Sequence, residues 1–403
     1  MSKSGNRLKR AIGLMSGTSM DGIDVAMIET DGEDQVVRGP GLTLPYNAGD
    51  RRILAHAMSA AQACRHRADR PDALAIAEEM VTRMHGAAVS AFLAQYGLER
   101  SSIDVIGFHG QTVAHRPVSN FVSGTDYKLG VAETVTLDVP KVMTLQLGNG
   151  AKLAQTTHID VVYDLRHADT EAGGQGAPLV PIYHKALVAK LPQRPLAMVN
   201  IGGVANVTFI GRDGELQAFD TGPGNALIDD WMMRKEGVQF DAQGATAATG
   251  VINQDVLRLC LSHEFFSASP PKSLDRNAFT WDAVEWMTTV DGAATLTAFT
   301  AEAIAKAREH FSEQPELWIV CGGGRKNKTL MSLLAGRVEN AVVPCEAVGL
   351  DGDMIEAEAW AYLAVRSQLG LPITFPGTTG VTKSMTGGVF SASSTRRSAG
   401  TAL

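Results

Sequence analysis

Two short apolar runs separated by a small polar turn form the first clear pattern in the chain. Residues 11–15 and 23–28 have the apolar character of buried strands, and the turn 16–22 is rich in glycine, serine, threonine and aspartate. We expect a β-hairpin whose turn exposes backbone N–H groups and hydroxyls that can bind an anion such as phosphate. An ordinary hairpin, in which these residues only shape the turn, is the alternative interpretation.

A similar strand–turn–strand pattern returns in the second half of the chain. Residues 196–200 are apolar, a glycine turn follows at 202–206, and residues 207–210 are apolar again. In each half the hairpin precedes helical periodicity and a buried strand, 103–108 or 317–321, that ends beside glycine. The repetition predicts a duplicated α/β fold of two domains, with a central cleft between the copies.

Apolar periodicity also predicts further elements and the domain limits. We expect strands at 35–44 and 160–165, a helix over 71–96 that stops at Gly97, and a helix over 354–369. The N-terminal domain is expected to span 1–165, with 370–390 packing back onto it, and the C-terminal domain to span 166–369. The tail 391–403 is polar and rich in small residues, and we expect it to be disordered.

Composition and charge favour a globular protein and argue against nucleic-acid-binding and membrane-spanning proteins. The 403 residues are 45% hydrophobic and 20% charged, with a net charge of −7 and no basic cluster interleaved with aromatics. This composition is typical of a globular protein and argues against a nucleic-acid partner. Apolar runs are too short for a membrane span, which needs roughly 18 residues. The four cysteines lack metal-binding or CxxC spacing, so we expect a cytoplasmic protein.

Polar clusters follow two of the predicted strands. His109 and Gln111 come directly after strand 103–108, and Arg166 and Asp169 follow the next buried strand. Ligands bind at the carboxyl ends of strands in open α/β sheets, so these side chains are candidates for substrate binding. A structural histidine, and an Arg–Asp pair that pins a domain junction, are the alternatives.

Asp220 is the candidate catalytic carboxylate. It ends an apolar run and is followed by the rigid sequence TGPGN at 221–225, which would hold its oxygens toward a ligand. A helix-capping or turn-capping role is the alternative.

Several of these motifs together resemble a known family. They are GLMSGTSMDGID (13–24), GFHGQT (107–112), DLRHADTEAGGQGAPLVP (164–181), NIGGVANVT (200–208), FDTGPGN (219–225), CGGG (321–324) and FPGTTG (375–380). In this order they resemble the anhydro-N-acetylmuramic acid kinase family, within the superfamily of sugar kinases, actin and heat-shock ATPases. The loop 271–279, PKSLDRNAF, departs from that family's pattern after Ser273.

The resemblance implies a duplicated actin-like ATPase (sugar-kinase) fold and a kinase that uses ATP and Mg²⁺. Such an enzyme hydrolyses the 1,6-anhydro ring of 1,6-anhydro-N-acetylmuramic acid and phosphorylates O6 during peptidoglycan recycling, as a homodimer in this family. It implies Asp220 as the base, with His109, Gln111, Arg166, Asp169 and Glu356 as candidates for the sugar. A levoglucosan kinase and a nucleotide-switched actin-like ATPase are the alternatives.

The same resemblance places ATP at three glycine turns. No metal ligand is certain, although Asp21 or Asp24 could position Mg²⁺ through water. The candidate ATP-binding residues are Gly17, Thr18, Ser19, Met20, Asp21, Gly22, Ile23, Asp24, Gly202, Gly203, Asn206, Gly322, Gly323 and Gly324.

Overall fold

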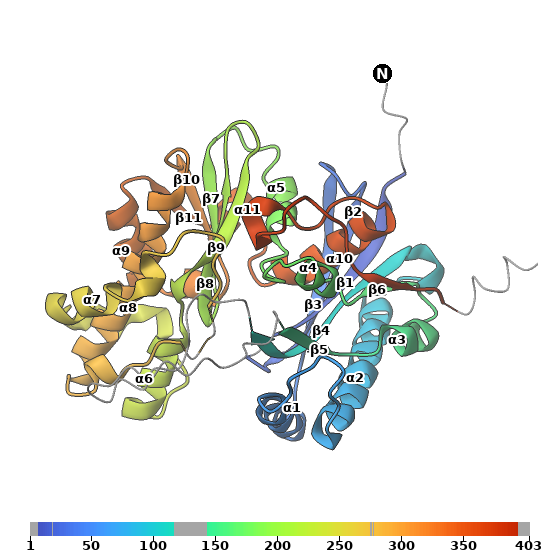
Figure 1. Cartoon of the computed structure of the whole chain (residues 1–403), viewed down its shortest axis with the longest axis horizontal. Helices are drawn as coiled ribbons and strands as arrows, with labels where there is room; N and C mark the ends of the chain where they lie inside the picture. Colours follow the sequence, from blue (N-terminus) through green and yellow to red (C-terminus); the bar gives the residue numbers. More distant parts are fainter. Residues whose placement is uncertain (1–6, 18, 117–142, 275, 277, 394–403) are drawn as a thin grey trace, which may run out of the picture. The chain divides into compact units, whose positions relative to one another are not determined.

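The computed structural model describes residues 7–17, 19–116, 143–274, 276 and 278–393 (Figure 1). These residues form two compact units. The first comprises the described residues of 1–117, 140–190 and 354–403, and the described residues of the second lie within 191–353. The chain therefore enters the second unit after Lys190 and returns to the first at Met354.

These limits differ from the expected ones, because the segment after residue 165 and the long helix after Met354 belong to the first unit. The tail also begins later than expected. Ser391 ends strand β12 and the Ser393 N–H donates to Asp160 at 2.9 Å, whereas the rest of the expected disordered tail, 394–403, lies outside the described residues.

A mixed sheet lies at the centre of the first unit, in the order β12-β6-β4-β1-β2-β3 with β5 paired to β4. β1 and β2 are the predicted first hairpin. The described strands are β1 (Lys9–Ser16), β2 (Gly22–Thr30), β3 (Val36–Pro45), β4 (Val105–Arg116), β5 (Met143–Leu147), β6 (Val161–Tyr163) and β12 (Val389–Ser391). The helices are α1 (Ala48–Ala61), α2 (Asp72–Tyr96), α3 (Gly150–Thr157), α4 (His167–Glu171), α5 (Pro181–Leu187), α10 (Ile355–Gln368) and α11 (Pro376–Thr379).

Successive residues of β1 point to opposite faces of this sheet, and a different helix packs on each face. Ile12 and Leu14 share a core cluster with residues of α2. Gly13 faces the other way, and a Cβ built on it would lie 1.7 Å from the Ala357 carbonyl oxygen of α10. Gly107, its register partner on β4, would meet the Trp360 oxygen at 1.9 Å. The two paired glycines therefore let α10 lie directly against the strand backbones.

The second unit contains a five-stranded sheet among its described residues, in the order β11-β10-β7-β8-β9. Residues of α8 and α9 share a core cluster with β7, β8, β9 and β10, and α6, α7 and α8 build a second cluster. The strands are β7 (Leu196–Ile201), β8 (Val204–Ile210), β9 (Leu216–Pro223), β10 (Leu317–Cys321) and β11 (Ala341–Pro344), and the helices are α6 (Ala226–Glu236), α7 (Gln254–Leu261), α8 (Thr289–Lys306) and α9 (Lys328–Val338).

Five strands of the first sheet have the same topology as the five strands of the second. In the first, β1 pairs antiparallel with β2 and β2 with β3, while β4 is parallel to both β1 and β6. In the second, β7, β8, β9, β10 and β11 repeat these pairings in the same sequence order. The predicted duplicated α/β fold is confirmed.

One predicted strand end is wrong. β4 does not stop at Phe108 but continues through the HGQT cluster to Arg116. Beyond Phe108 it gains a new antiparallel partner, β5, whose Leu147 pairs with Gln111. Gly110, at a φ of 75°, allows the change of direction between the two pairings. His109 and Gln111 therefore lie within a strand rather than in a loop after it.

Candidate active site

The first hairpin turn is closed by local bonds and offers an exposed polar tip. Met20 N–H donates to the Gly17 oxygen at 3.1 Å, and Asp21 Oδ1 accepts from Ser19 Oγ at 2.9 Å. Ser19 and Asp21 are exposed, and a Cβ on Gly17 would meet nothing closer than 3.5 Å. A ligand can therefore approach the turn at Gly17, Ser19 and Asp21.

Not every candidate in this turn is available to a ligand. Gly22 packs on β3, where an added Cβ would lie 2.6 Å from the Leu44 oxygen, and the Ile23 side chain is in the core. Asp24 accepts from Thr43 Oγ1 at 2.6 Å. Thr18 lies outside the described residues.

Gln111 supports this turn from inside the protein. Its side chain is fully buried, its Nε2 donates to the Gly17 oxygen at 3.0 Å, and its Oε1 accepts from Ser16 Oγ. The Ser16 hydroxyl in turn bonds the Tyr46 hydroxyl at 2.9 Å. Both ends of the Gln111 amide are thus bonded to the hairpin, and Nε2 also donates to the Thr112 oxygen at 3.3 Å.

His109 and Arg166 lie together on the face covered by α10. Arg166 Nη2 is 3.2 Å from His109 Nε2, and the Trp360 ring of α10 lies 4.3 Å from the imidazole, centroid to centroid. Burial, followed by the Arg166 charge, holds the pKa of His109 well below its ordinary value. A neutral imidazole can accept the guanidinium hydrogen bond through Nε2. Burial and Arg166 likewise lower the pKa of His115 to about 3.

Asp169 and Arg166 both hold the glycine turn that follows them. Asp169 is buried, and its Oδ2 accepts from the Gly176 N–H at 2.7 Å while its Oδ1 accepts from Thr379 Oγ1 at 2.6 Å. Arg166 Nη1 donates to the Gly176 oxygen at 2.8 Å. These bonds join the GGQG turn (173–176) to the FPGTTG segment (375–380). Both Asp169 oxygens are therefore bonded within the protein.

The two glutamates at the start of α10 have different environments. Glu358 is buried, pairs with Arg38 at 2.8 Å and accepts from the Tyr183 hydroxyl at 2.8 Å. Glu356 is partly exposed in the first turn, one helical turn before Trp360. Of the two glutamates, Glu356 is the more exposed.

In the second unit, the Gly202–Gly203 turn is fixed by the TGPGN segment. Gly224 N–H donates to the Gly203 oxygen at 2.9 Å and Asn225 N–H to the Gly202 oxygen at 2.8 Å. Only glycine fits at 224, since a Cβ there would lie 2.2 Å from the Gly202 oxygen. Gly203 itself is exposed.

Asp220 lies on β9 opposite Asn206 of β8. Its N–H donates to the Lys272 oxygen at 3.0 Å, and its Oδ2 accepts from the Leu274 N–H at 2.7 Å. The carboxylate is thus held by a strand and by the loop 271–274, and one of its oxygens accepts a backbone N–H of that loop. Behind it, Lys272 is buried against the Phe265 and Phe219 rings.

Arg276, which follows this loop, is a cation beside the Gly202–Gly203 turn that the sequence did not predict as a site residue. A Cβ on Gly203 would lie 3.8 Å from Arg276 Nε, and Arg276 Nη2 pairs with Asp230 Oδ1 at 3.2 Å. Burial, and then the Asp230 charge, raise the pKa of the neighbouring Asp229 to about 7. An arginine beside a glycine turn suits phosphate binding. Trp360 was also missed, although its spacing of one turn from Glu356 could have indicated it.

The three glycines of the loop after β10, Gly322, Gly323 and Gly324, which we call the late glycine loop, have different surroundings. Gly322 has a φ of 74°, and a Cβ on Gly324 would lie 2.3 Å from the Ile201 side chain. Gly323 is exposed and has no such neighbour. Gly322 and Gly324 therefore let the loop pack on β7, and Gly323 remains exposed.

The described residues contain neither a metal-binding cluster nor a membrane-spanning helix. No group of three or more His, Cys, Asp or Glu side chains is arranged to hold a metal ion. Among the described helices, none has the length and hydropathy that crossing a bilayer would require.

Two equivalent α/β units, each opened by a glycine hairpin, with an oriented carboxylate on the second, define a protein of the sugar kinase and actin-like ATPase class. Residues 9–392 match the family model described as anhydro-N-acetylmuramic acid kinase. The chain belongs to that family.

Curated relatives agree with the family model. An anhydro-N-acetylmuramic acid kinase from Methylobacterium nodulans is 50% identical over 391 residues, covering 94% of this chain and 99% of the relative. One from Agrobacterium fabrum is 47% identical over 388 residues, covering 95% and 98%. Among solved structures, component A of (R)-2-hydroxyglutaryl-CoA dehydratase from Acidaminococcus fermentans is similar at 9% identity and a TM-score of 0.46, covering 90% of this chain and 99% of that one.

Proposed function

We propose that the chain uses ATP and water to convert 1,6-anhydro-N-acetylmuramic acid into N-acetylmuramic acid 6-phosphate and ADP, in peptidoglycan recycling. The observation that carries the proposal is Asp220, a carboxylate oriented by the Leu274 N–H at 2.7 Å beside a glycine turn, in a member of this kinase family. The base of such a reaction must be fixed, because it acts on a small nucleophile.

In the proposed reaction, Asp220 takes a proton from water as the oxygen attacks C1 of the sugar. The C1–O6 bond breaks, O6 bonds to the γ-phosphorus, and the bond between the γ-phosphorus and its bridging oxygen breaks to release ADP. Asp220 pairs with Asn206 across the sheet and is bonded to the loop 271–274. These contacts fix the carboxylate, which supports its assignment as the base.

The phosphates of ATP are assigned to the glycine turns. In the first unit, the partly exposed Gly17 and the exposed Ser19 and Asp21 support this role, with Gln111 as a positioning residue. In the second unit, Gly203 and Arg276 support it, and the open Gly323 is assigned to the adenosine.

Mg²⁺ would be held mainly by the phosphates of ATP, because the described residues contain no cluster of ligands for it. The Asp21 carboxylate is exposed and fits an outer contact through water. When bound, the ion neutralises charge on the transferred phosphoryl group.

The sugar is assigned to the first unit, with the partly exposed Glu356 and the neutral His109 as direct contacts. Arg166 and Asp169 fix the GGQG turn beside the assigned sugar site, and the Trp360 ring packs on the His109 imidazole.

A side-by-side assay tests the proposal. ADP and sugar phosphate are measured by mass spectrometry with 1,6-anhydro-N-acetylmuramic acid and with levoglucosan. Sugar phosphate from the first sugar alone supports the proposal, and preference for levoglucosan contradicts the substrate. Ring opening without ATP would indicate a hydrolase, and ATP hydrolysis indifferent to sugar would indicate a switch protein.

We also propose that the enzyme works in the cytoplasm and as a homodimer. All four cysteines are free, which suits a reducing compartment. Val251, Leu259 and Trp286 are large apolar residues of the second unit that are more than three-fifths exposed, which supports a partner there. Light scattering after size exclusion measures the mass, and a monomer at micromolar concentration would contradict the dimer.

A further inference from the structure

One buried arginine holds the late glycine loop. The Arg325 side chain is only 5% exposed, its Nη1 donates to the Gly322 oxygen at 2.9 Å, and its Nε donates to Glu346 Oε1 at 2.7 Å. Because Gly322 starts the loop, the position of this guanidinium fixes the loop's first peptide.

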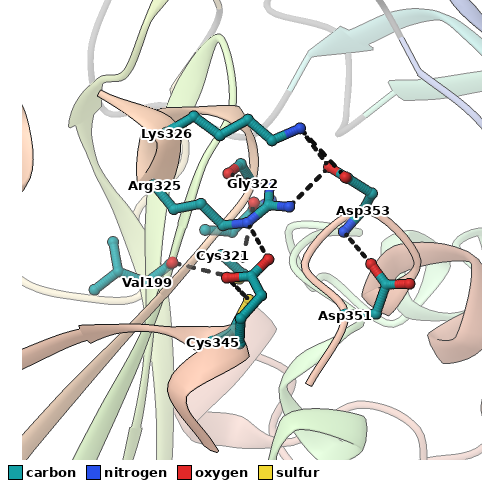
Figure 2. A network of polar contacts seen from close by, with 10 residues as sticks. Val199, Cys321, Gly322, Arg325, Lys326, Cys345, Asp351 and Asp353 are labelled. Atoms are coloured by element: carbon teal, nitrogen blue, oxygen red, sulfur yellow. Dashed lines mark hydrogen bonds and ion pairs between the residues drawn. The ribbon is translucent and has the colours of Figure 1, made fainter. Parts of the chain in front are cut away.

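The same guanidinium contacts a second segment of the chain. Arg325 Nη2 pairs with Asp353 Oδ1 at 3.0 Å, and Lys326 Nζ lies 3.1 and 3.2 Å from the two Asp353 oxygens (Figure 2). Gly352 lies so close that an added Cβ would be 2.4 Å from Arg325 Nε. The segment 351–353 is therefore packed against the arginine and bonded to it.

Asp353 has a special place in the chain. It is the last residue of the second unit, and Met354 begins the segment that returns to the first. α10 starts at Ile355 and carries Glu356 in its first turn. Only two residues, Met354 and Ile355, thus separate Asp353 from Glu356, the carboxylate assigned to the sugar.

We propose that the Arg325–Asp353 pair couples nucleotide binding at the glycine loop to the first turn of α10, so that nucleotide and sugar strengthen each other's binding. The inference rests on the proposed function, which assigns Gly323 to adenosine and Glu356 to the sugar. A ligand that moves or orders the loop acts on the Gly322 carbonyl, and a buried guanidinium with several fixed partners transmits that change to Asp353. By linkage, the sugar must affect nucleotide affinity by the same factor.

Calorimetric titration of the full chain tests the coupling. Affinity for a non-hydrolysable ATP analogue is measured with and without saturating 1,6-anhydro-N-acetylmuramic acid, and the ratio is the coupling factor. For the wild type we expect a factor of about 10, within the usual range of allosteric coupling. Asp353→Ala should bring it to about 2 or less while leaving the affinity for each ligand alone within about threefold.

Glu346→Ala is the matched control. It removes one bond to the same guanidinium from a carboxylate of similar exposure, 48% against 54% for Asp353, but Glu346 does not lie in the returning segment. We expect this variant to keep the wild-type coupling factor. Both carboxylates are half exposed, so both variants should fold, and thermal melting checks this.

Failure of the coupling and failure of the proposed function give different binding results. Equal loss of coupling in both variants, or full coupling in Asp353→Ala, overturns the proposed route. Wild-type protein that binds both ligands independently also overturns it, while the proposed function stands. Wild-type protein that binds neither ligand overturns the proposed function and the coupling together.

Discussion

Replacing Asp220 by asparagine separates the proposed chemical role of this carboxylate from its structural role. The Asp220 Oδ2 accepts a bond from the Leu274 N–H at 2.7 Å. An asparagine amide oxygen can accept the same bond, so the loop 271–274 should stay docked. The loss on passing from a charged to a neutral acceptor is about 1 kcal/mol of stability.

The effect on turnover should be much larger. General-base catalysis contributes about 10² to 10⁴ in rate, which corresponds to about 3 to 5 kcal/mol in the activation free energy. We therefore expect kcat to fall by that factor, while the affinity for ADP changes less than about threefold.

The assay is coupled ADP release with saturating anhydrosugar, together with calorimetric binding of ADP. Asp213→Asn is the control, because Asp213 is an exposed carboxylate of the same unit that also accepts one backbone N–H, from Glu215 at 2.8 Å. It should leave kcat unchanged. A kcat within about fivefold of wild type for Asp220→Asn would refute the base assignment.

Three further predictions concern packing, charge and positioning. Gly13→Ala should lower the unfolding free energy by about 3 kcal/mol or more, because α10 would have to move away, whereas Gly336→Ala, with open space around it, should be neutral or slightly stabilising in denaturant titrations. Burial, with Lys306 second, lowers the pKa of Lys272 from 10.5 to about 8, so the unfolded chain holds this proton more tightly. The stability of wild type relative to Lys272→Met should therefore rise by about 2 kcal/mol between pH 8 and 10 in urea titrations, and parallel pH curves would contradict this. Gln111→Leu should raise KM for ATP about tenfold and leave KM for the sugar unchanged, whereas a rise only for the sugar would return Gln111 to the sugar site.

Local patterns were enough to predict much of the fold. The two hairpins, α2 with its stop at Gly97, strand β10 and helix α10 follow from apolar periodicity and glycine positions near in sequence. The end of β4 could not be predicted in this way, since it depends on pairing with β5, which is distant in sequence. The burial of Gln111 follows from that same long-range pairing.

Motifs near in sequence singled out some candidate side chains. Asp220 became a candidate because it stands next to the rigid segment TGPGN. Arg276 and Arg325 carry no local signal, because their carboxylate partners are contributed by α6 and by the segments around Glu346 and Asp353. Asp169 looked like a ligand-binding carboxylate, and only the positions of Gly176 and Thr379 reveal its bonds.

The return of the chain at Met354 also sets an order of assembly during synthesis. The described part of the second unit is contiguous in sequence, so it can complete its sheet as soon as residue 353 has left the ribosome. The first unit begins earlier but must wait for α10, and until then the bare backbone around Gly13 and Gly107 is uncovered. We therefore expect a released chain truncated before α10 to contain a protease-resistant second unit and a first unit that is still incomplete.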